Sequence, residues 1–539
     1  MRRMIAVILF LLAPLFVHSA EVAVVARGKG YYTSIARHLE RWLAEQDITV
    51  DFMDSSQMSA SSIAKKKMVF LVGFDSPAPA ELDIIEQAKS KGVKFTVFYS
   101  ASPRLSAMMG VKPLGYRKAN YPGQFSKMNF NTAQLEGLPP SIRQTSTVLQ
   151  SAAPLAGRGK TLAFWCDRTG KSTGEAAVIS TDCGFWITHV FLADGDEDLK
   201  ARLTAVFVGS VAPHLWSWPK ACEKALAEHK KLRAYSLKQI PRKGEIHAVW
   251  DHSGCGLYPG DWPKTMKVLQ EARITDLFVN VAGAGFAHYS SNILPRSKIY
   301  EEEGDQLKSC LAAAKDRGIR VHAWILCFTS TRSSPDRVKS FAAKGWLLKD
   351  RDGKQTEYLD PSNAAVREYI LSAISEIQSK YPVDGIHLDF VRWYERAVKP
   401  ADASDIISRF VVDARKKVVR PKWLTAAVLG KYPTCVASVG QDWVSWLDTR
   451  QIDYAVPMDY SEDNAKFESF IAQHAESKSR AKRIIAGIGV TANESRLEPK
   501  QVIDQINIVR RHNLAGVALF DLDVVLEKRI LPYLKLGLW

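Results

Sequence analysis

Eight short apolar runs follow one another through the second half of the chain, and a stretch with helical character separates each run from the next. Strands that alternate with helices indicate a parallel sheet, because each helix returns the chain to the edge where the next strand begins. Eight such units within residues 245–539 fit the size of a (β/α)8 barrel. The predicted strands are IHAVWD (246–251), TDLFVNVA (275–282), RVHAWIL (320–326), GIHLDF (385–390), WLTAAVL (423–429), DYAVPMDY (453–460), RIIAGIG (483–489) and GVALFDLD (516–523).

The fourth run ends in a carboxylate. Ile386, Leu388 and Phe390 share one parity, whereas His387 and Asp389 share the other, and side chains along a strand alternate between its two faces. The apolar set suits the side that faces the outer helices. We therefore expect His387 and Asp389 to point inward near the C-terminal mouth, where barrel enzymes carry their reactive groups. The alternative is that Asp389 only caps the next helix.

Residues 21–229 also alternate apolar runs with helical stretches, which indicates a smaller α/β domain with a parallel sheet in front of the barrel. Gly28 and Gly30 form a lone G-x-G without the further glycine of a dinucleotide fingerprint. A G-x-S-x-G nucleophile elbow is absent as well. We expect this domain to be structural or to mediate homo-oligomerisation, and we expect no cofactor.

The predicted order along the chain is a signal peptide (1–20), the α/β domain (21–229), a charged linker flanked by Pro and Gly (230–244) and the barrel (245–539). Residues 1–20 combine two arginines, an apolar core and a small-residue exit, which is typical of a secretory signal peptide. No later apolar run reaches the roughly 20 residues of a membrane span. The expected location is therefore secreted or periplasmic, without a membrane span.

The chain is basic, with 73 Lys and Arg against 57 Asp and Glu. These residues are spread along the sequence, which favours a solvated surface over a nucleic-acid interface. The seven cysteines show no C-x-x-C spacing, and the histidines at 252, 288, 322 and 387 come from different strand units. The sequence therefore predicts no metal site.

The stretch DGIHLDFVR (384–392) resembles the fourth-strand motif of glycoside hydrolase barrels, whose inward Asp acts on the sugar. It is similar to the bacterial glycosyl-hydrolase-like barrels of the tenth such family, in which this strand reads roughly VDGIHxDDY. GIRVHAW (318–324) and PMDY (457–460) recur in that family on the third and sixth strands. The chain departs from the pattern at Phe390, where the family tends to show a second acid. The first domain resembles the flavodoxin-like or glutamine-amidotransferase-like domains found beside some carbohydrate-active barrels.

Polar and aromatic residues at the strand ends fit a sugar site. Pyranose rings pack their C–H faces on aromatic rings, and their hydroxyls need acidic, amide and imidazole partners. Asp389 is the predicted nucleophile or charge-stabilising group, and Arg392 and His387 are expected to favour its ionised form. From strand position and the resemblance, the predicted substrate contacts are Trp250, Asp251, Asn280, His322, Trp324, His387, Arg392 and Tyr460.

Glycosidic cleavage also needs a protonated acid at the leaving oxygen. Amylase-type barrels supply it from strand five and chitinase-type barrels two residues after the fourth-strand Asp, and neither place holds a carboxylate here. The candidates, in order, are Glu462, Asp459, Glu395 and Asp251. Strand eight also ends in two acids, Asp521 and Asp523, to which no role is assigned.

These features predict an exported glycoside hydrolase that cleaves O-glycosidic bonds in a polysaccharide or cell-envelope glycan by carboxylate acid/base chemistry. Two alternatives stay open. One is a non-catalytic carbohydrate-binding barrel, and the other is an envelope scaffold protein.

Overall fold

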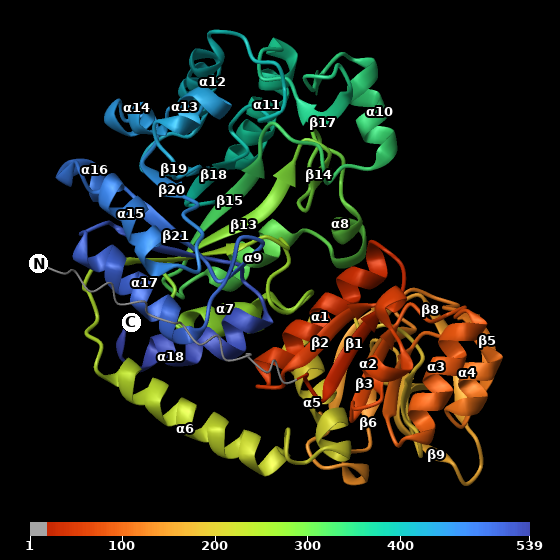
Figure 1. Cartoon of the computed structure of the whole chain (residues 1–539). Coiled ribbons are helices and arrows are strands. Elements are labelled where there is room, and N and C mark those ends of the chain that lie inside the picture. Colours follow the sequence, from red (N-terminus) through yellow and green to blue (C-terminus); the bar gives the residue numbers. More distant parts are fainter. Residues whose placement is uncertain (1–18) are drawn as a thin grey trace, which may run out of the picture. The chain divides into compact units, whose positions relative to one another are not determined.

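The computed structural model describes residues 19–539, so the predicted signal peptide lies almost entirely outside the described residues. The chain divides into two compact units, one ending at Ala227 and the other running from Glu228 to Trp539 (Figure 1). Among residues 19–539, no helix is both long enough and apolar enough to cross a membrane.

The first unit is built on a nine-stranded sheet with the order β2-β1-β3-β4-β11-β10-β9-β6-β7. Helices α1 and α5 pack on one face, and α2, α3 and α4 pack on the other (Figure 1). The strands are β1 (Val22–Ala26), β2 (Val50–Asp54), β3 (Met68–Val72), β4 (Lys94–Phe98), β6 (Phe125–Phe130), β7 (Ser141–Ser146), β9 (Gly159–Cys166), β10 (Ser172–Thr181) and β11 (Gly184–Ile187). The helices are α1 (Tyr31–Glu45), α2 (Ala60–Ile63), α3 (Pro79–Ser90), α4 (Pro103–Met108) and α5 (Glu197–Val211).

The predicted parallel sheet is confirmed for five strands of this unit, β2, β1, β3, β4 and β11. The other four strands of the sheet are antiparallel to their neighbours. The reason is that β9, β10 and β11 are joined by short turns, and a turn without a crossover helix reverses the strand direction. A separate antiparallel pair, β5 (Val111–Lys118) and β8 (Val148–Pro154), completes the unit.

The second unit is the predicted barrel. Its strands are β12 (Ile246–Asp251), β13 (Asp276–Gly283), β15 (Arg320–Leu326), β18 (Gly385–Asp389), β19 (Trp423–Val428), β20 (Tyr454–Pro457), β21 (Ile485–Gly489) and β24 (Gly516–Phe520). They pair in parallel in the order β20-β19-β18-β15-β13-β12-β24-β21. Parallel bridges from Ala455 to Ile484 and from Met458 to Gly487 join the two ends of this series. The barrel is therefore nearly closed, and the predicted (β/α)8 fold is confirmed.

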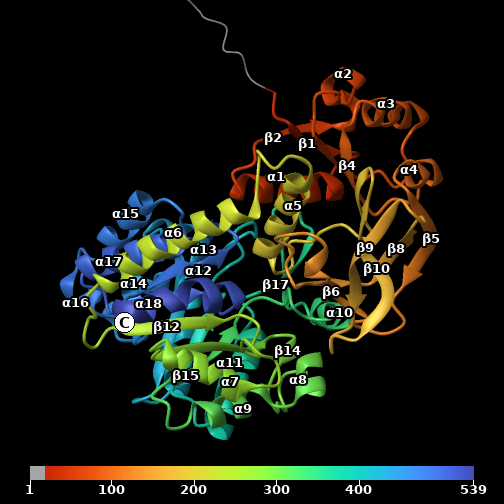
Figure 2. The ribbon, with the colours of Figure 1, turned by 90° about the horizontal axis from the view of Figure 1, so that it is seen from below.

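Helices and short hairpins connect the barrel strands. The helices are α7 (Trp262–Glu271), α8 (Lys298–Glu303), α9 (Gln306–Ala314), α10 (Pro335–Ala343), α11 (Ala364–Lys380), α12 (Ala403–Lys417), α13 (Thr434–Val439), α14 (Trp443–Asp448), α15 (Asn464–His474), α16 (Lys478–Ala481), α17 (Pro499–Arg511) and α18 (Leu531–Gly537). Two further hairpins are β16 (Leu347–Lys349) with β17 (Gln355–Leu359) and β22 (Thr491–Ala492) with β23 (Ser495–Arg496). Neighbouring helices pack on one another around the strands, as α15 and α17 do (Figure 2).

Side chains alternate across the barrel wall as the sequence predicts. Ile386 and Leu388 belong to the apolar layer between strands and helices, whereas Trp250, Phe278 and Trp324 fill the inside of the barrel. Each strand is thus buried on both faces, which is what parallel sheets require. Polar groups that point inward must therefore find partners inside the barrel.

The segment predicted as a linker, residues 230–244, is partly helical. Helix α6 (Trp218–Leu237) continues through its first half. The last turns of α6 are tied to the barrel unit, because His229 hydrogen-bonds the Tyr533 hydroxyl at 2.8 Å and the Tyr235 hydroxyl donates to Asp504 at 2.6 Å. The chain becomes irregular after Leu237 and enters β12 at Ile246.

Gly385, at the start of β18, makes room for two larger side chains. A methyl group at this position would lie 2.5 Å from His322 Nδ1 and 2.5 Å from the carbonyl oxygen of Trp423. Because the position has no side chain, the His322 and Trp423 rings stack across β18, with their centroids 5.3 Å apart.

Replacing Gly385 with alanine should destabilise the barrel. The carbonyl of Trp423 is backbone and cannot rotate away, so the expected cost is about 3 kcal/mol, as for overpacked cores. Thermal unfolding of the Gly385→Ala protein should show a clearly lower midpoint. Gly353→Ala, in an exposed turn with φ of 78° and open space around it, should lose only the roughly 1 kcal/mol of left-handed strain. Equal midpoints for the two variants would contradict the packing described here.

Candidate active site

Asp389 ends β18 inside the C-terminal mouth of the barrel. Its Oδ2 accepts a hydrogen bond from Trp324 Nε1 at 3.2 Å, and its Oδ1 accepts one from the backbone N–H of Phe390 at 2.6 Å. Phe390 has a φ of 49°, so the chain turns sharply just after the carboxylate. The side chain is nearly buried, with 6% of the residue exposed. Asp389 is therefore held in one orientation by two N–H donors.

Burial raises the pKa of Asp389, while the charge of Arg392 and the two N–H donors act in the opposite direction. The sequence predicted that Arg392 and His387 together would favour the ionised carboxylate. Burial, followed by the charge of His322, holds the pKa of His387 well below its usual range. His387 is therefore neutral, and only Arg392 supplies a positive charge to Asp389.

His387 forms the floor beneath Asp389 together with Trp250. An indole N–H can only donate, so Trp250 Nε1 donates to His387 Nε2 at 2.9 Å. The remaining ring nitrogen, Nδ1, then carries the proton and donates to Thr425 Oγ1 at 2.8 Å. Phe278 stacks on the imidazole with the ring centroids 4.1 Å apart. Trp250 and His387, both predicted to contact substrate, are instead buried and support the groups above them.

The rim of the mouth is an aromatic chain that starts at Trp324. His252 lies 5.8 Å from Trp324 and 5.9 Å from Phe520 between ring centroids, and Phe520 stacks on Tyr460 at 5.6 Å. His252 is exposed, and Phe520 and Tyr460 are half-buried. Trp324 and Tyr460, both predicted substrate contacts, thus lie in one aromatic surface next to Asp389.

Asp521 brings a second carboxylate to this rim. Its Oδ1 accepts from the backbone N–H groups of His252 at 3.1 Å and Leu522 at 2.7 Å. Burial and the neighbouring charges of Asp251 and Asp523 raise the pKa of Asp521 to about 7. The pKa of Tyr460 is also raised, by burial and then by the charges of Asp389 and Asp521. Both carboxylates therefore lie close to the same tyrosine.

Two buried polar groups on the β13 side of the mouth have atoms without partners. Asn280 is fully buried, and neither its Oδ1 nor its Nδ2 has a hydrogen-bond partner among the described residues. It shares the parity of Phe278, which lies inside the barrel. His288 bonds Ser297 through Nδ1, while its Nε2 has no partner in the same part of the chain. An unpartnered buried amide is costly, and the role of Asn280 as a substrate contact stays a prediction.

Two of the predicted carboxylates, Asp251 and Asp459, have structural partners. Asp251 has the outward parity of Val249, and its two oxygens accept from the Ser253 hydroxyl and from the N–H groups of residues 253, 254 and 256. Asp459 lies opposite Tyr460 in parity and pairs with His474 Nε2 at 3.0 Å. These carboxylates hold the local backbone and helix α15, in place of the catalytic or substrate role predicted for them.

His322 is fully buried toward the N-terminal end of the barrel, two residues below Trp324 on β15. Its Nε2 donates to Asp276 Oδ1 at 2.8 Å, and Arg320 holds both oxygens of the same carboxylate. Burial alone would raise the pKa of Asp276, but the hydrogen bonds from His322 and Arg320 lower it to about 2. His322 thus belongs to a buried charged cluster and not to the mouth where it was predicted to contact substrate.

Glu462, the first candidate for the acid, is exposed and accepts from the backbone N–H of Arg496 through Oε1 at 2.9 Å. Glu395 is exposed as well. Arg392 lies with its guanidinium 4.2 Å above the Phe390 ring, and its Nη1 is buried without a partner among residues 19–539. Arg392 is therefore available to a ligand at the mouth.

The sequence reasoning assigned no role to four residues that the structure places at the mouth, namely His252, Arg332, Phe520 and Asp521. Asp521 has the outward parity of Leu519, but β24 ends at Phe520, so strict alternation does not apply to it. Arg332 Nη1 donates to the carbonyl of His252 at 3.2 Å from the loop after β15. One feature of the sequence could have pointed to Asp521. The first and eighth strands are neighbours in a closed barrel, so the acids at their ends, Asp251 and Asp521, lie close together.

The fold and the site define a (β/α)8 barrel whose carboxylates and aromatic rings gather at the C-terminal ends of the strands, where barrel enzymes act. Residues 262–405, from α7 to the start of α12, match the sequence family described as Glycosyl hydrolase-like 10. The family resemblance predicted from the fourth strand is thereby confirmed for this part of the barrel, which includes Asp389.

Known proteins with partial similarity carry related descriptions. Glycosyl hydrolase DigH of Escherichia coli (strain K12) is 33% identical over 138 residues, which covers 22% of this chain and 31% of that protein. The chain thus spans about a third of the length of the curated relatives it matches. The PgaB (BpsB) glycoside hydrolase domain from Bordetella bronchiseptica has 12% identity and a TM-score of 0.44, over 55% of this chain and 99% of that one. Alpha-L-fucosidase isoenzyme 2 from Paenibacillus thiaminolyticus has 12% identity and a TM-score of 0.39, over 55% and 48%.

The raised pKa of Asp521 predicts a pH-dependent loss of stability. The folded chain holds this proton up to about pH 7, whereas an unfolded Asp releases it near pH 4. Stability from this group is therefore complete below pH 4 and decreases by up to about 4 kcal/mol as the pH rises to 7. Asp521→Asn removes the group that must ionise in the folded protein. The unfolding midpoint of this variant should therefore exceed that of the wild type by more at pH 8 than at pH 5.

The exposed carboxylate of Asp336, on α10, offers a control for this measurement. Asp336→Asn should change the midpoint by the same small amount at both pH values. A midpoint difference for Asp521→Asn that does not vary with pH would show that Asp521 titrates normally.

Proposed function

We propose that the barrel is a glycoside hydrolase in which Asp389 is the negative group at the anomeric carbon and Asp521 is the general acid. The single observation that carries the proposal is that the buried carboxylate of Asp389 and the half-buried carboxylate of Asp521 lie beside the same tyrosine in contrasting environments. Asp389 is held by two N–H donors near Arg392, whereas Asp521 has its pKa raised to about 7 beside two other acids. Burial raises the pKa of both groups, but Asp389 has Arg392 and two N–H donors that favour its carboxylate, whereas Asp521 has two acids beside it that favour its protonated form. Two carboxyl groups in such different environments suit opposite roles in acid/base catalysis.

In the proposed step, the bond between the anomeric carbon and the leaving oxygen breaks while the Asp521 proton passes to that oxygen. Positive charge then develops on the sugar ring, and the Asp389 carboxylate either stabilises it or forms a bond to the anomeric carbon. Water completes the reaction and supplies the hydroxyl of the product. The spacing of the two carboxylates in the bound complex would decide between the retaining and inverting outcomes.

The proposed substrate is a polysaccharide or cell-envelope glycan. Tyr460 and Phe520 are half-buried and offer aromatic faces for sugar rings, and Asn280 offers an unpartnered amide for a hydroxyl. The description of the matching family and the name of the relative from Escherichia coli support a substrate with a glycosidic bond. We also propose export, because residues 1–20 have the composition of a signal peptide.

Replacing either carboxylate should lower activity in a different way. The mature protein is first tested for release of reducing sugar from neutral, acidic and amino-sugar polysaccharides. On the glycan that is cleaved, Asp389→Asn and Asp521→Asn should each lose about 10²–10⁴-fold in rate. On a dinitrophenyl glycoside of the same sugar, whose leaving group needs no proton, Asp521→Asn should stay near wild type while Asp389→Asn stays slow.

Glu462→Gln provides the discriminating arm of this experiment. It should cleave the polysaccharide at the wild-type rate if Asp521 is the acid. If Glu462→Gln instead loses its rate on the polysaccharide and keeps a wild-type rate on the dinitrophenyl glycoside, then Glu462, the acid predicted from the sequence, is the general acid. If no glycan is cleaved and one glycan binds wild type and Asp389→Asn equally, the barrel is a carbohydrate-binding module.

Activity should fall at alkaline pH through Asp521. The acid works only while it carries its proton, and its pKa is about 7. In the wild type, kcat/KM for the polysaccharide should therefore decrease about tenfold per pH unit above pH 7. The residual activity of Asp521→Asn should lack this alkaline limb. An alkaline limb that persists unchanged in the variant would assign the proton to another group.

A further inference from the structure

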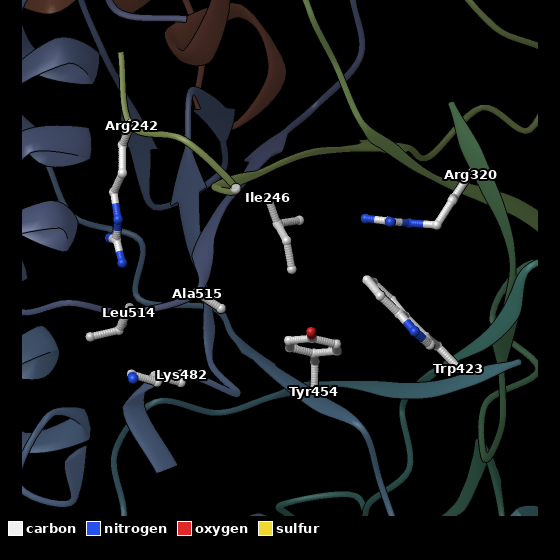
Figure 3. A pocket seen from close by; sticks show the side chains of 9 residues that line it. Arg242, Ile246, Arg320, Trp423, Tyr454, Lys482, Leu514 and Ala515 are labelled. Carbon is white, nitrogen blue, oxygen red and sulfur yellow. The ribbon is translucent and has the colours of Figure 1, made fainter. Parts of the chain in front are cut away.

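A cavity of about 330 Å³ opens at the N-terminal ends of the barrel strands, at the opposite end from Asp389. Its volume lies at the lower end of the range for ligand pockets, ~300–1,000 Å³. Figure 3 shows its side chains arranged around an open centre, with Tyr454 and Trp423 on one side, Arg320 and Ile246 across from them, and Arg242 and Lys482 at the far edge.

Small residues keep this end of the barrel open. Gly244 and Ala515 line the cavity where other strands contribute large side chains. Adding a methyl group at Gly516 would bring it within 2.1 Å of the carbonyl oxygen of Ile246, so β12 and β24 approach closely beside the cavity. The wall opposite is aromatic, because Trp423 lies across Gly385 and is backed by His322.

The aromatic wall is an open wedge. The Trp423 and Tyr454 rings have centroids 4.6 Å apart and are tilted by 45°. Such a wedge leaves no parallel slot for a flat aromatic ligand, whereas the C–H face of a chair-shaped sugar can pack on one ring and its edge on the other. Both aromatic residues are half-buried. The Arg320 guanidinium lies 4.3 Å above the Trp423 ring and His322 stacks on the same ring, so Tyr454 supplies the ring face that is open to a ligand.

The charge in the cavity is positive. Arg320 is neutralised by Asp276, which it holds at 2.7 and 2.8 Å. Arg242 and Lys482 form no ion pair within residues 19–539, and Arg242 Nη1 is buried without a hydrogen-bond partner in that range. A guanidinium with an unused, buried donor is well suited to a carboxylate, which can accept two parallel hydrogen bonds from it.

We propose that this cavity is a second carbohydrate site that binds an acidic sugar. The carboxylate of a uronic acid would lie between Arg242 and Lys482, and its ring would pack on Tyr454, which lies between these two residues and Trp423. The site is separate from the proposed catalytic one, because the buried layer of Trp250, Phe278 and His387 lies between them. The proposal therefore holds or fails whether or not the barrel cleaves glycans.

To test this proposal, the full mature chain is titrated with glucuronic acid, and binding is measured by calorimetry and by saturation-transfer NMR. The double variant Arg242→Gln/Lys482→Gln should raise the dissociation constant for glucuronic acid at least tenfold. Glucose should bind the wild type at least tenfold more weakly than glucuronic acid does. Lys267→Gln/Lys308→Gln removes the same charge from exposed positions on α7 and α9, and it should leave the affinity unchanged. Neither pair of positions belongs to the hydrophobic core, so both double variants are expected to fold.

Several results would overturn the proposal. No binding of glucuronic acid, or equal binding to both double variants, would remove the site. Sulfate that competes as well as glucuronic acid would show a site for small anions only. Benzoate that binds more tightly than glucuronic acid would assign the aromatic wedge to a planar acid and not to a sugar.

Discussion

The hydrogen bond from Trp250 to His387 is the interaction on which the centre of the barrel depends. A parallel barrel buries every strand on both faces, so a polar ring inside it must have each nitrogen satisfied. The indole takes Nε2 and Thr425 takes Nδ1, which ties β12, β18 and β19 together through side chains as well as backbone. Phe278 stacks on the same imidazole. The rigid floor that results holds Asp389 and Trp324 in their places above it.

The barrel could be predicted because its signal is local. Runs such as Ile386 to Asp389 alternate between the outer apolar layer and the interior, and eight such runs fix the fold class. Phe390 was predicted to face outward as well, but the strand ends at Asp389 and Phe390 packs against the interior cluster. The first unit shows where this reasoning fails. Its β9 and β10 have the same apolar character as the parallel strands, and only the short turn at residues 167–171 distinguishes a hairpin from a crossover. Strand direction there is set by the turn, and apolar content carries no information on it.

The position of Asp389 followed from parity alone, but its electrostatics did not. Burial and the neutral state of His387 depend on which strands lie beside β18, and the sequence does not state that order. Asp521 shows the same limit more strongly, since its raised pKa comes from burial and from Asp251 on a strand distant in sequence. Asp459 and Asp251 were predicted as site residues because each carboxylate lies near the end of a strand. The sequence does not show that Asp251 already accepts from backbone N–H groups or that Asp459 already pairs with a histidine.

The fixed tautomer of His387 has a consequence for proton movement. An imidazole relays a proton only if one nitrogen can accept it while the other releases its own. Here the accepting nitrogen is occupied by an indole N–H, which does not give up its proton, and the ring is sealed from solvent on all sides. The middle of the barrel therefore insulates its two ends from each other. Protons that reach Asp389 or Asp521 must enter and leave through the C-terminal mouth, together with the water that any turnover would consume.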